Sequence, residues 1–471
     1  MNIVYRPTEL ALSLISSIRR FPGHWTVGAW IWLDLPTFVW WSGRASLSRI
    51  WHSPAAVFYP APAADHILSA VWYGLGVAVL VLAYRPFVGL LEGGQWGARM
   101  AATLTLALAA GSFPFVSHDV FAYFGEWRVM ALYHRNPMVT PIAAIPRWRA
   151  DPWLLRGGWE WTVNPYGPSW FLLVGLIGQA APAGFAGFFL VWKSVALGLT
   201  LTQALMVHLL RRGSAVRLLV HPVVTIELLA NAHNDVVMMT AMMAAYILWT
   251  RRRWLPAGLL AGISIATKYI SAIVLPWLLV ATPGWRARTA TLLAAGGAAI
   301  ITLAIFWHGP RTLLGPLQST HLFLRSPAFL VQGLLVHLSG LPRAHSRHVA
   351  LIITTAIFLA LFIESGRRFI ADRDPIHLGD AMLGAALVLM SCLQFWYLSW
   401  ALPFYVLDSQ PRSRRLTQYL AYLEWVRVIG WPAGLPTVVQ LTQVTFIWAG
   451  LAWYLWPLRF HARAEIRFRK A

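Results

Sequence analysis

Long apolar runs separated by short polar segments dominate this chain. The runs lie at about 67–84, 101–116, 168–181, 185–210, 218–230, 236–250, 255–266, 270–281, 290–307, 328–341, 349–363, 379–395, 400–407 and 438–458. A membrane-spanning helix needs about 20 mainly apolar residues, so the longer runs predict transmembrane helices. Together the runs predict an all-α polytopic membrane protein with roughly 11–14 spans and no separate soluble domain.

Two segments are ambiguous: residues 25–41, which are not among these runs, and the run 168–181. Residues 25–41 are apolar and rich in tryptophan, but an aspartate and a proline interrupt them. Residues 168–181 are short and glycine-rich, which fits either a short span or a re-entrant segment. Before both, residues 10–18 form an amphipathic stretch bracketed by arginines, which predicts a helix on the membrane surface.

Composition supports the membrane class. Of 471 residues, 58% are hydrophobic and 12% charged, and the mean hydropathy is +0.58. Soluble domains contain about 45–50% apolar and about 25% charged residues. The net charge is +21, but the basic residues form short clusters between apolar runs, so we expect no nucleic-acid partner. The single cysteine, Cys392, excludes an intrachain disulfide and a cysteine metal site. We also expect no cleavable signal peptide.

Charge asymmetry predicts an orientation. The positive-inside rule assigns to the cytoplasm the basic clusters at 19–20, 85, 211–217, 251–253, 286–288, 343–347, 367–368, 412–415 and 459–470. The opposite side then receives the long loop 117–165, the Asn231–Asp235 turn, Lys268, the loop 308–327 and residues 394–400. The conspicuous polar clusters are therefore predicted to share the extracytoplasmic face.

The stretch from Ser117 to Pro137 carries the first candidate site. Asp119, Tyr123 and Glu126 are spaced i, i+4, i+7, which places them on one face of a helix that follows an apolar run. Acids at a membrane surface indicate a polar site beside lipid. The alternative is a capping aspartate followed by ordinary surface acids.

A second cluster crowds the end of a short apolar run at Asn231, His233, Asn234 and Asp235. One helix cap needs one such residue, so four polar groups favour a functional role over capping alone. Further along, Lys268 lies between two apolar runs, where a lysine either extends to the interface or binds a phosphate.

The aromatic segment 394–400 has two interpretations. Tryptophan and tyrosine in such a segment form an interfacial belt in many membrane proteins. The same rings also stack on sugars and prenyl chains, so a belt and a binding site are compatible.

The order of these motifs resembles the GT-C glycosyltransferases, and more closely the bacterial polyprenyl-phosphate-mannose-dependent alpha-mannosyltransferases. The resemblance covers about residues 100–405 and rests on Ser117-His118-Asp119, Glu126-Trp127-Arg128, Asn136-Pro137, Tyr166-Gly167-Pro168, His233-Asn234-Asp235, Lys268, Trp396-Tyr397 and Trp400. This chain departs from the family pattern at His118, where many relatives carry a second acid, at Trp127, where many have glycine, and at Met138, where an aromatic residue is expected.

The resemblance implies a GT-C-like helical bundle that moves a hexose, expected to be mannose, from a polyprenyl-phosphate donor to a glycan or glycolipid acceptor. It implies a bacterial plasma-membrane protein with its site on the extracytoplasmic side. It divides the chain into an N-terminal region (1–66), a catalytic core (67–410) and C-terminal helices with a basic tail (411–471). It implies Asp119 as the catalytic base, and as substrate-binding residues Glu126, Arg128, Asn136, Tyr166, His233, Asn234, Asp235, Lys268, Arg325, Tyr397 and Trp400.

The implied chemistry needs three kinds of group. Asp119 would accept the proton of the acceptor hydroxyl as general base. Cationic side chains would stabilise the departing phosphate, and the candidates are Lys268, Arg128, His233 and Arg325. Apolar helices near 185–210 or 328–395 would hold the prenyl chain. Asp119 and Asp235 are also candidate ligands for Mg²⁺ or Mn²⁺, although lysine and arginine alone can handle a monophosphate donor.

A lipid or solute transporter is the alternative from another class. Transporters tend to show internal repeats and polar groups near the bilayer centre. This chain shows no evident repeat, and its polar groups gather at one predicted surface beside long loops. The pattern therefore favours the enzyme.

Overall fold

The computed structural model confirms an all-α polytopic membrane protein. It describes residues 7–44, 63–114, 117–151, 153–154, 160–181, 184–313, 323–408, 410–429 and 440–454. Within them there is no strand, and Leu324 and Cys392 form an isolated bridge. Residues 314–322 of the loop 308–327 and the basic tail 459–470 lie outside the described residues.

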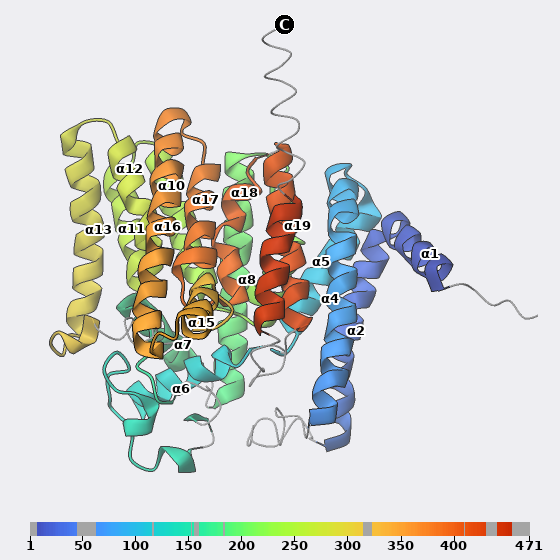
Figure 1. Cartoon of the computed structure of the whole chain (residues 1–471), viewed down its shortest axis with the longest axis horizontal. Coiled ribbons are helices and arrows are strands. Elements are labelled where there is room, and N and C mark those ends of the chain that lie inside the picture. The colour runs from blue at the N-terminus through green and yellow to red at the C-terminus, as the bar shows by residue number, and fades with distance from the viewer. Residues whose placement is uncertain are drawn as a thin grey trace, which may run out of the picture.

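The N-terminal helices lie together at one edge of the bundle, with α1 tilted relative to the others (Figure 1). They are α1 (Pro7–Arg20), α2 (Pro22–Arg44), α4 (Ala63–Glu92) and α5 (Trp96–Gly111). The doubtful segment 25–41 is part of α2, which continues through its aspartate and proline. Trp32 of α2 and Trp72 of α4 stack with centroids 3.6 Å apart, and each indole donates to the other's carbonyl. This reciprocal contact fixes the pairing of the two helices.

The middle of the chain forms most of the central bundle. Its elements are α8 (Phe185–Leu210), α9 (Ala215–Leu219), η5 (Val224–Ala230), α10 (Asp235–Thr250), α11 (Trp254–Thr267), η6 (Tyr269–Val274), α12 (Leu275–Ala281) and α13 (Trp285–Ile305). The predicted apolar run 218–230 is divided between α9 and η5. In η5 the helix is widened to a π-helix, a form that is frequent at functional sites.

The C-terminal part completes the bundle. Its elements are α15 (Pro327–Ser339), α16 (Arg343–Asp372), α17 (Ile376–Gly384), η8 (Ala385–Leu389), η9 (Phe395–Trp400), α18 (Leu402–Tyr405), α19 (Pro411–Ile429) and a last helix over 440–454. The basic segment 412–415, which the sequence pattern treats as a connector, is the first turn of α19.

One part of the predicted orientation is wrong. The basic clusters 343–347 and 367–368 were both assigned to the cytoplasm, but they occupy the two ends of the single helix α16. A helix of 30 residues is about 45 Å long, and α16 is apolar enough to span a membrane. Its two ends therefore cannot lie on the same side if it spans.

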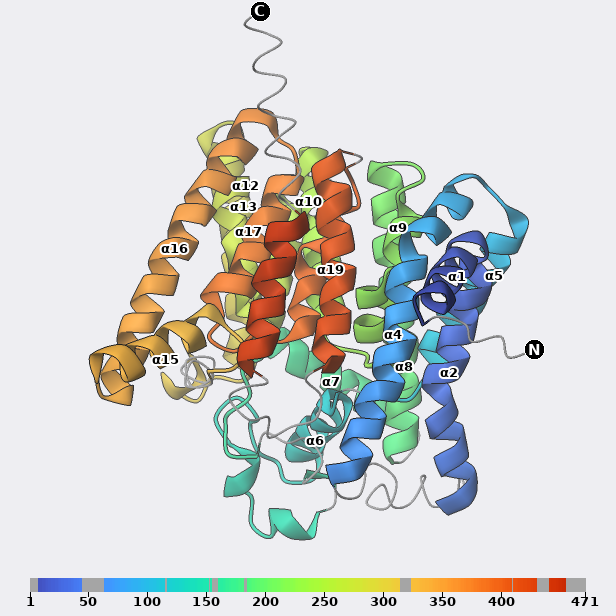
Figure 2. The same ribbon diagram turned by 45° about the vertical axis from the view of Figure 1, so that its right-hand side comes forward.

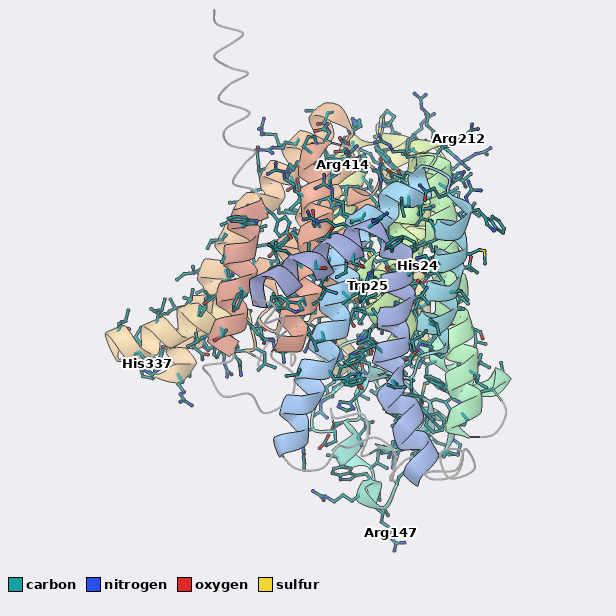
Figure 3. All side chains as sticks on the ribbon, turned by 90° about the vertical axis from the view of Figure 1, so that its right-hand side faces the viewer. His24, Trp25, Arg147, Arg212, His337 and Arg414 are labelled. Carbon is teal, nitrogen blue, oxygen red and sulfur yellow. The ribbon has the colours of Figure 1, made fainter. Side chains whose placement is uncertain are left out.

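Two helices and a long loop cover one end of the bundle, which is the lower end in Figures 1 and 2. They are α6 (Asp119–Ala131), α7 (Pro168–Ala180) and the loop between them, with short turns η2 (Ile142–Ala144) and η3 (Trp148–Ala150). Arg147 in this loop lies at the opposite end of the molecule from Arg212 and Arg414 (Figure 3). The loop 117–165 and the basic clusters at 212 and 414 are thus separated as predicted.

Four of the described helices are long and apolar enough to cross a membrane: Val71–Glu92 within α4, α8, α13 and α16. Several shorter apolar helices, including α7, α10 and α11, accompany them. The number of spans expected from the sequence stays a prediction.

Helices α11 and α13 approach closely through glycine. A Cβ at Gly258 would overlap the carbonyl oxygen of Thr291, and a Cβ at Gly262 would overlap that of Ala295. Both obstacles are backbone atoms, which cannot rotate away. Small residues spaced four apart allow this kind of approach between membrane helices.

We expect Gly262→Ala to lower the free energy of unfolding by about 1–3 kcal/mol, because the added methyl group forces the two helices apart. Thermal unfolding in detergent measures the loss as a lower melting temperature. The matched control is Gly296→Ala in α13, where a Cβ meets nothing within 4 Å. An equal loss in both variants would contradict the close-approach explanation.

Candidate functional site

A cavity of about 480 Å³ opens where α6 and the loop between α6 and α7 meet the bundle. Its polar part contains Asp119, Glu126 and Lys268, and its aromatic part contains Tyr166, Trp396, Tyr397 and Trp400. An apolar part is formed by Ile270, Leu351, Leu389 and Met390. The cavity thus joins charged groups to an apolar arm that reaches α16 and η8.

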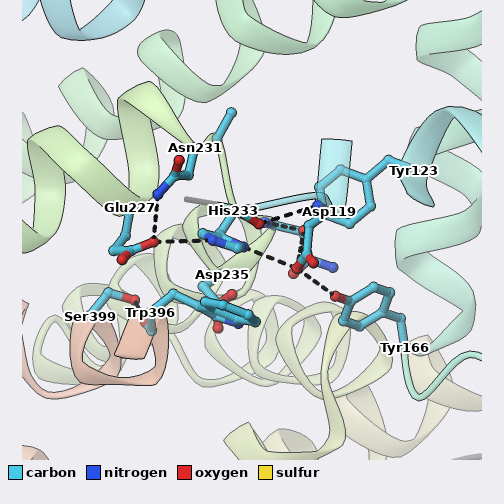
Figure 4. A network of polar contacts seen from close by, with 12 residues as sticks. Asp119, Tyr123, Tyr166, Glu227, Asn231, His233, Asp235, Trp396 and Ser399 are labelled. Carbon is cyan, nitrogen blue, oxygen red and sulfur yellow. Dashed lines mark hydrogen bonds and ion pairs between the residues drawn. The ribbon is translucent and has the colours of Figure 1, made fainter. Parts of the chain in front are cut away.

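Asp119 is the first residue of α6 and is only 5% exposed. Its Oδ2 atom lies 3.1 Å from His233 Nδ1, 3.4 Å from the Tyr166 hydroxyl and 3.5 Å from the Tyr123 hydroxyl (Figure 4). These three contacts end on one oxygen of the carboxylate. Asp119 also lines the cavity, where a ligand can reach it.

Electrostatics keep Asp119 ionised. Burial raises the pKa of this carboxyl group, but the contact with His233 and the charges of Lys268 and His118 outweigh it. The pKa is therefore lowered below its ordinary value of 3.8. At neutral pH Asp119 is a carboxylate, as a general base requires.

Glu126 lies two turns further along the same face of α6, as the spacing predicts. Its two oxygens accept from Trp170 Nε1 at 2.7 Å and from Asn164 Nδ2. Burial raises the pKa of Glu126, and these two hydrogen bonds offset part of the rise. Asn164 precedes the Tyr166-Gly167-Pro168 turn, so Glu126 anchors that turn against α6.

Lys268 is held at the cavity wall between α11 and η6. Its Nζ donates to Asp235 Oδ1 at 2.8 Å and to Asn234 Oδ1 at 3.4 Å. Tyr166, Tyr397 and Trp400 surround the ammonium group, with centroids 5.2–5.7 Å away. An ammonium group has three N–H bonds, so one remains for a ligand in the cavity.

His233 lies behind the cavity wall and is fully buried. Its Nδ1 faces Asp119 and its Nε2 lies 3.1 Å from Glu227 Oε2. The ring stacks on Trp396 with centroids 3.9 Å apart. Glu227 in turn pairs with Arg427 of α19.

The residues predicted to form the site separate into two groups and three outliers. Those that line the cavity are Asp119, Glu126, Tyr166, Lys268, Tyr397 and Trp400. Those that lie buried behind it and hold the lining residues are His233, Asn234 and Asp235. The residues of the second group therefore hold the lining residues in place and do not line the cavity themselves.

The three outliers lie away from the cavity lining. Arg128 makes two hydrogen bonds to Asp151 Oδ2, at 2.6 and 3.0 Å. Asn136 donates to the carbonyl of Phe306 at 2.6 Å. Arg325 is placed over the ring of Phe395. Their predicted substrate contacts stay predictions.

The capping interpretation of the second cluster is not supported. Helix α10 begins at Asp235, and Asn234 occupies its N-cap position without a capping hydrogen bond from its side chain. Asp235 instead faces Lys268 and accepts from Trp400 Nε1. The polar side chains of this turn are therefore used in tertiary contacts.

Sequence reasoning missed Glu227 and Arg427. Both are buried, and Glu227 is an ionisable residue inside the apolar run 218–230. Such a residue within an apolar segment is a functional candidate by default, and this signal alone would have identified it. Arg427 carries no comparable signal, because its helix α19 is polar along much of its length.

The described residues offer little for a divalent cation. They contain no group of three or more histidine, cysteine, aspartate or glutamate side chains placed to hold a metal ion. Asp235, one of the two candidate ligands, does not line the cavity, and its Oδ1 already faces Lys268 and Trp400. We therefore derive no step through a metal.

Comparisons with known proteins identify a family and a relative to which this chain is similar. The family described as "Alpha-(1->6)-mannopyranosyltransferase, N-terminal domain" matches residues 35–284, just over half of the chain. The chain is 26% identical, over 263 residues, to alpha-(1->6)-mannopyranosyltransferase A of Mycobacterium tuberculosis. This match covers 51% of the chain and 49% of the relative, so the chain spans about half the length of that protein. No solved structure matches.

We expect Lys268→Met to lower the free energy of unfolding by about 3–5 kcal/mol, because it leaves the buried Asp235 carboxylate without its cation. Thermal unfolding in detergent measures this loss. The double variant Lys268→Met/Asp235→Asn removes both charges and should recover much of the stability. If the double variant is as unstable as the sum of the two single variants, the ion pair is not the cause.

Proposed function

Because this chain belongs to the alpha-(1->6)-mannopyranosyltransferase family, we propose that it is a membrane glycosyltransferase that transfers a hexose, mannose, to a glycan or glycolipid acceptor. We further propose that the donor is a polyprenyl-phosphate-linked sugar. The observation that carries the proposal is the buried, ionised Asp119 at the wall of a cavity that also contains Lys268 and an apolar arm.

The proposed reaction is a single displacement at the anomeric carbon. The acceptor oxygen forms the new bond to that carbon while the bond to the donor's phosphate oxygen breaks. Asp119 takes the acceptor's proton on Oδ1, since its Oδ2 makes the three contacts described above. The phosphate leaves with the electron pair of the broken bond as a polyprenyl phosphate.

Lys268 is the proposed partner of the leaving phosphate. Its third N–H bond and its charge would stabilise the negative charge that grows on the phosphate oxygens. Asp235 and Asn234 fix the direction of the ammonium group, so little reorganisation is needed during the reaction. Tyr166, Tyr397 and Trp400 around it supply flat apolar surfaces on which a sugar ring can stack.

The apolar arm is the proposed site for the first prenyl units. Leu351 and Thr355 of α16 and Leu389 of η8 line it. Of the two helix groups named from the sequence, the one at 328–395 contributes to the cavity lining, and 185–210 does not. Because α16 is long and apolar enough to span a membrane, a lipid tail could leave the arm along it.

We propose that the cavity faces the extracytoplasmic side of a bacterial plasma membrane. The loop 117–165 lies at the end of the molecule opposite Arg212 and Arg414 (Figure 3), and clusters of arginine favour the cytoplasmic side. No comparison supports the transporter alternative.

The test is sugar transfer by purified protein in detergent, with polyprenyl-phosphate-mannose as donor and an oligomannoside as acceptor. We expect Asp119→Asn to lower kcat by about 10²–10⁴-fold, because the amide cannot accept the acceptor's proton. Binding of the donor should persist, since Lys268 and the apolar arm are unchanged.

Asp151→Asn is the matched control. Asp151 is also a buried aspartate in the same loop region, but it pairs with Arg128 away from the cavity lining. Its loss should affect stability more than kcat. Equal turnover by wild type and Asp119→Asn would remove Asp119 from the reaction, and lipid-dependent flux without any transfer would favour a transporter.

A further inference from the structure

A chain of buried ionisable groups leads from Asp119 into the protein. His233 and Glu227 are fully buried, and Arg427 is 5% exposed. His233 lies between Asp119 and Glu227, as Figure 4 shows. Its two ring nitrogens are each 3.1 Å from an oxygen of one of these carboxylates. Glu227 then pairs with Arg427 of α19. The proposed base is thereby connected to a helix that does not contribute to the cavity lining.

The His233 ring has a carboxylate at each nitrogen. Its Nδ1 lies 3.1 Å from Asp119 Oδ2 and its Nε2 lies 3.1 Å from Glu227 Oε2. Trp396 stacks on the ring with centroids 3.9 Å apart. These contacts fix the orientation of the His233 ring between the two carboxylates.

Glu227 is fixed from several directions. Asn231 Nδ2 donates to its Oε2 at 3.1 Å, and Arg427 faces its Oε1. The backbone N–H of His233 donates to the carbonyl of Glu227 at 2.9 Å. Arg427 also lies over the ring of Trp396, on which His233 stacks. These contacts leave Glu227 little freedom to move away from the histidine.

We propose that Glu227 is a positioning residue for the transfer reaction: it holds the His233 ring against Oδ2 of Asp119, so that Oδ1 is directed toward the acceptor. This inference rests on the proposed function. Along the chain, the carboxylates of Asp119 and Glu227 alternate with the basic side chains of His233 and Arg427. Such an arrangement suits burial, because each carboxylate lies against a basic group. The acceptor's proton ends on Asp119, and none passes through Glu227.

Other charged and titratable groups lie around the four side chains Asp119, His233, Glu227 and Arg427. They are His118, Tyr123 and Glu126 on the α6 side, and Tyr166, Asp235, Lys268 and Tyr397 on the other elements. Lys268 is a nearby cation, but it faces Asp235 at 2.8 Å. His233 is therefore the basic side chain in direct contact with Asp119.

The first experiment measures the pH dependence of kcat for wild type and Glu227→Gln with polyprenyl-phosphate-mannose. Without the Glu227 carboxylate, the His233 ring is no longer held in place, and the contact that lowers the pKa of Asp119 weakens. Asp119 is then protonated at higher pH, so the acid limb of the profile should move up by about one pH unit or more. KM for the donor should stay within about twofold, since Glu227 does not line the cavity.

The matched control is Glu424→Gln. Like Glu227, Glu424 is a buried glutamate, and it lies in α19 one turn before Arg427. Among the described residues, the ion pair of His233 on its Nε2 side is with Glu227 and not with Glu424. The acid limb of the pH profile of kcat for Glu424→Gln should coincide with that of wild type. A movement of equal size in this control would overturn the proposal.

A variant cycle separates positioning from a general structural role. His233→Gln should move the acid limb as Glu227→Gln does, and the double variant should add nothing further, because Glu227 acts through His233. If the double variant loses as much kcat as the two single variants together, the proposal is overturned. If Glu227→Gln fails to fold because Arg427 is left unpaired, Glu227→Gln/Arg427→Met removes both charges and should show the same shift.

The outcomes distinguish the two proposals. Wild-type transfer with an unmoved acid limb in the Glu227 variants overturns the positioning role and leaves the proposed function standing. Absence of transfer by wild type from any lipid-linked sugar overturns both.

Discussion

Buried charges that must be paired constrain this structure more than any other interaction. Removing an ion from water costs several kcal/mol, so a charged side chain inside an apolar bundle needs a partner at a fixed place. Lys268 faces Asp235, Arg427 faces Glu227, and Arg412 makes two 2.8 Å contacts with Asp380. The first pair joins the consecutive helices α10 and α11, whereas Arg427 and Glu227 join helices that are far apart in the chain. The ion pairs therefore determine which segments lie against each other. Burial of apolar surface drives the helices together but does not set how one helix is aligned against the next.

Lys193 illustrates how such a group acts at a distance from the cavity. It lies within the apolar helix α8, and its Nζ donates to the carbonyls of Ala109, Leu229 and Ala230. Carbonyl groups near the end of a helix lack partners within it. One buried lysine thus connects the ends of α5 and η5, immediately before the turn that carries His233 and Asp235. The position of the candidate site depends on a residue that no ligand would touch.

The fold class and several features of the site follow from local patterns. The spacing of Asp119, Tyr123 and Glu126 predicts a shared helix face, and α6 has these residues buried on its inner side. The apolar run 185–210 matches α8 in full. These predictions succeed because helix periodicity and apolar length are properties of neighbouring residues. The division of the run 379–395 between α17, η8 and η9 was not predicted, because packing around the cavity interrupts the helix there.

By itself the sequence determined an all-α membrane protein, the helix that begins at Asp119 and a set of polar motifs in a family-like order. Only the tertiary structure decided which of those motif residues line the cavity and which support it. Lys268 and Tyr397 line it, whereas His233 and Asp235 lie behind it. It also brought Glu227 and Arg427 together. The reason is physical: such contacts join residues far apart in the chain, and the packing of whole helices, rather than local spacing, sets their distances.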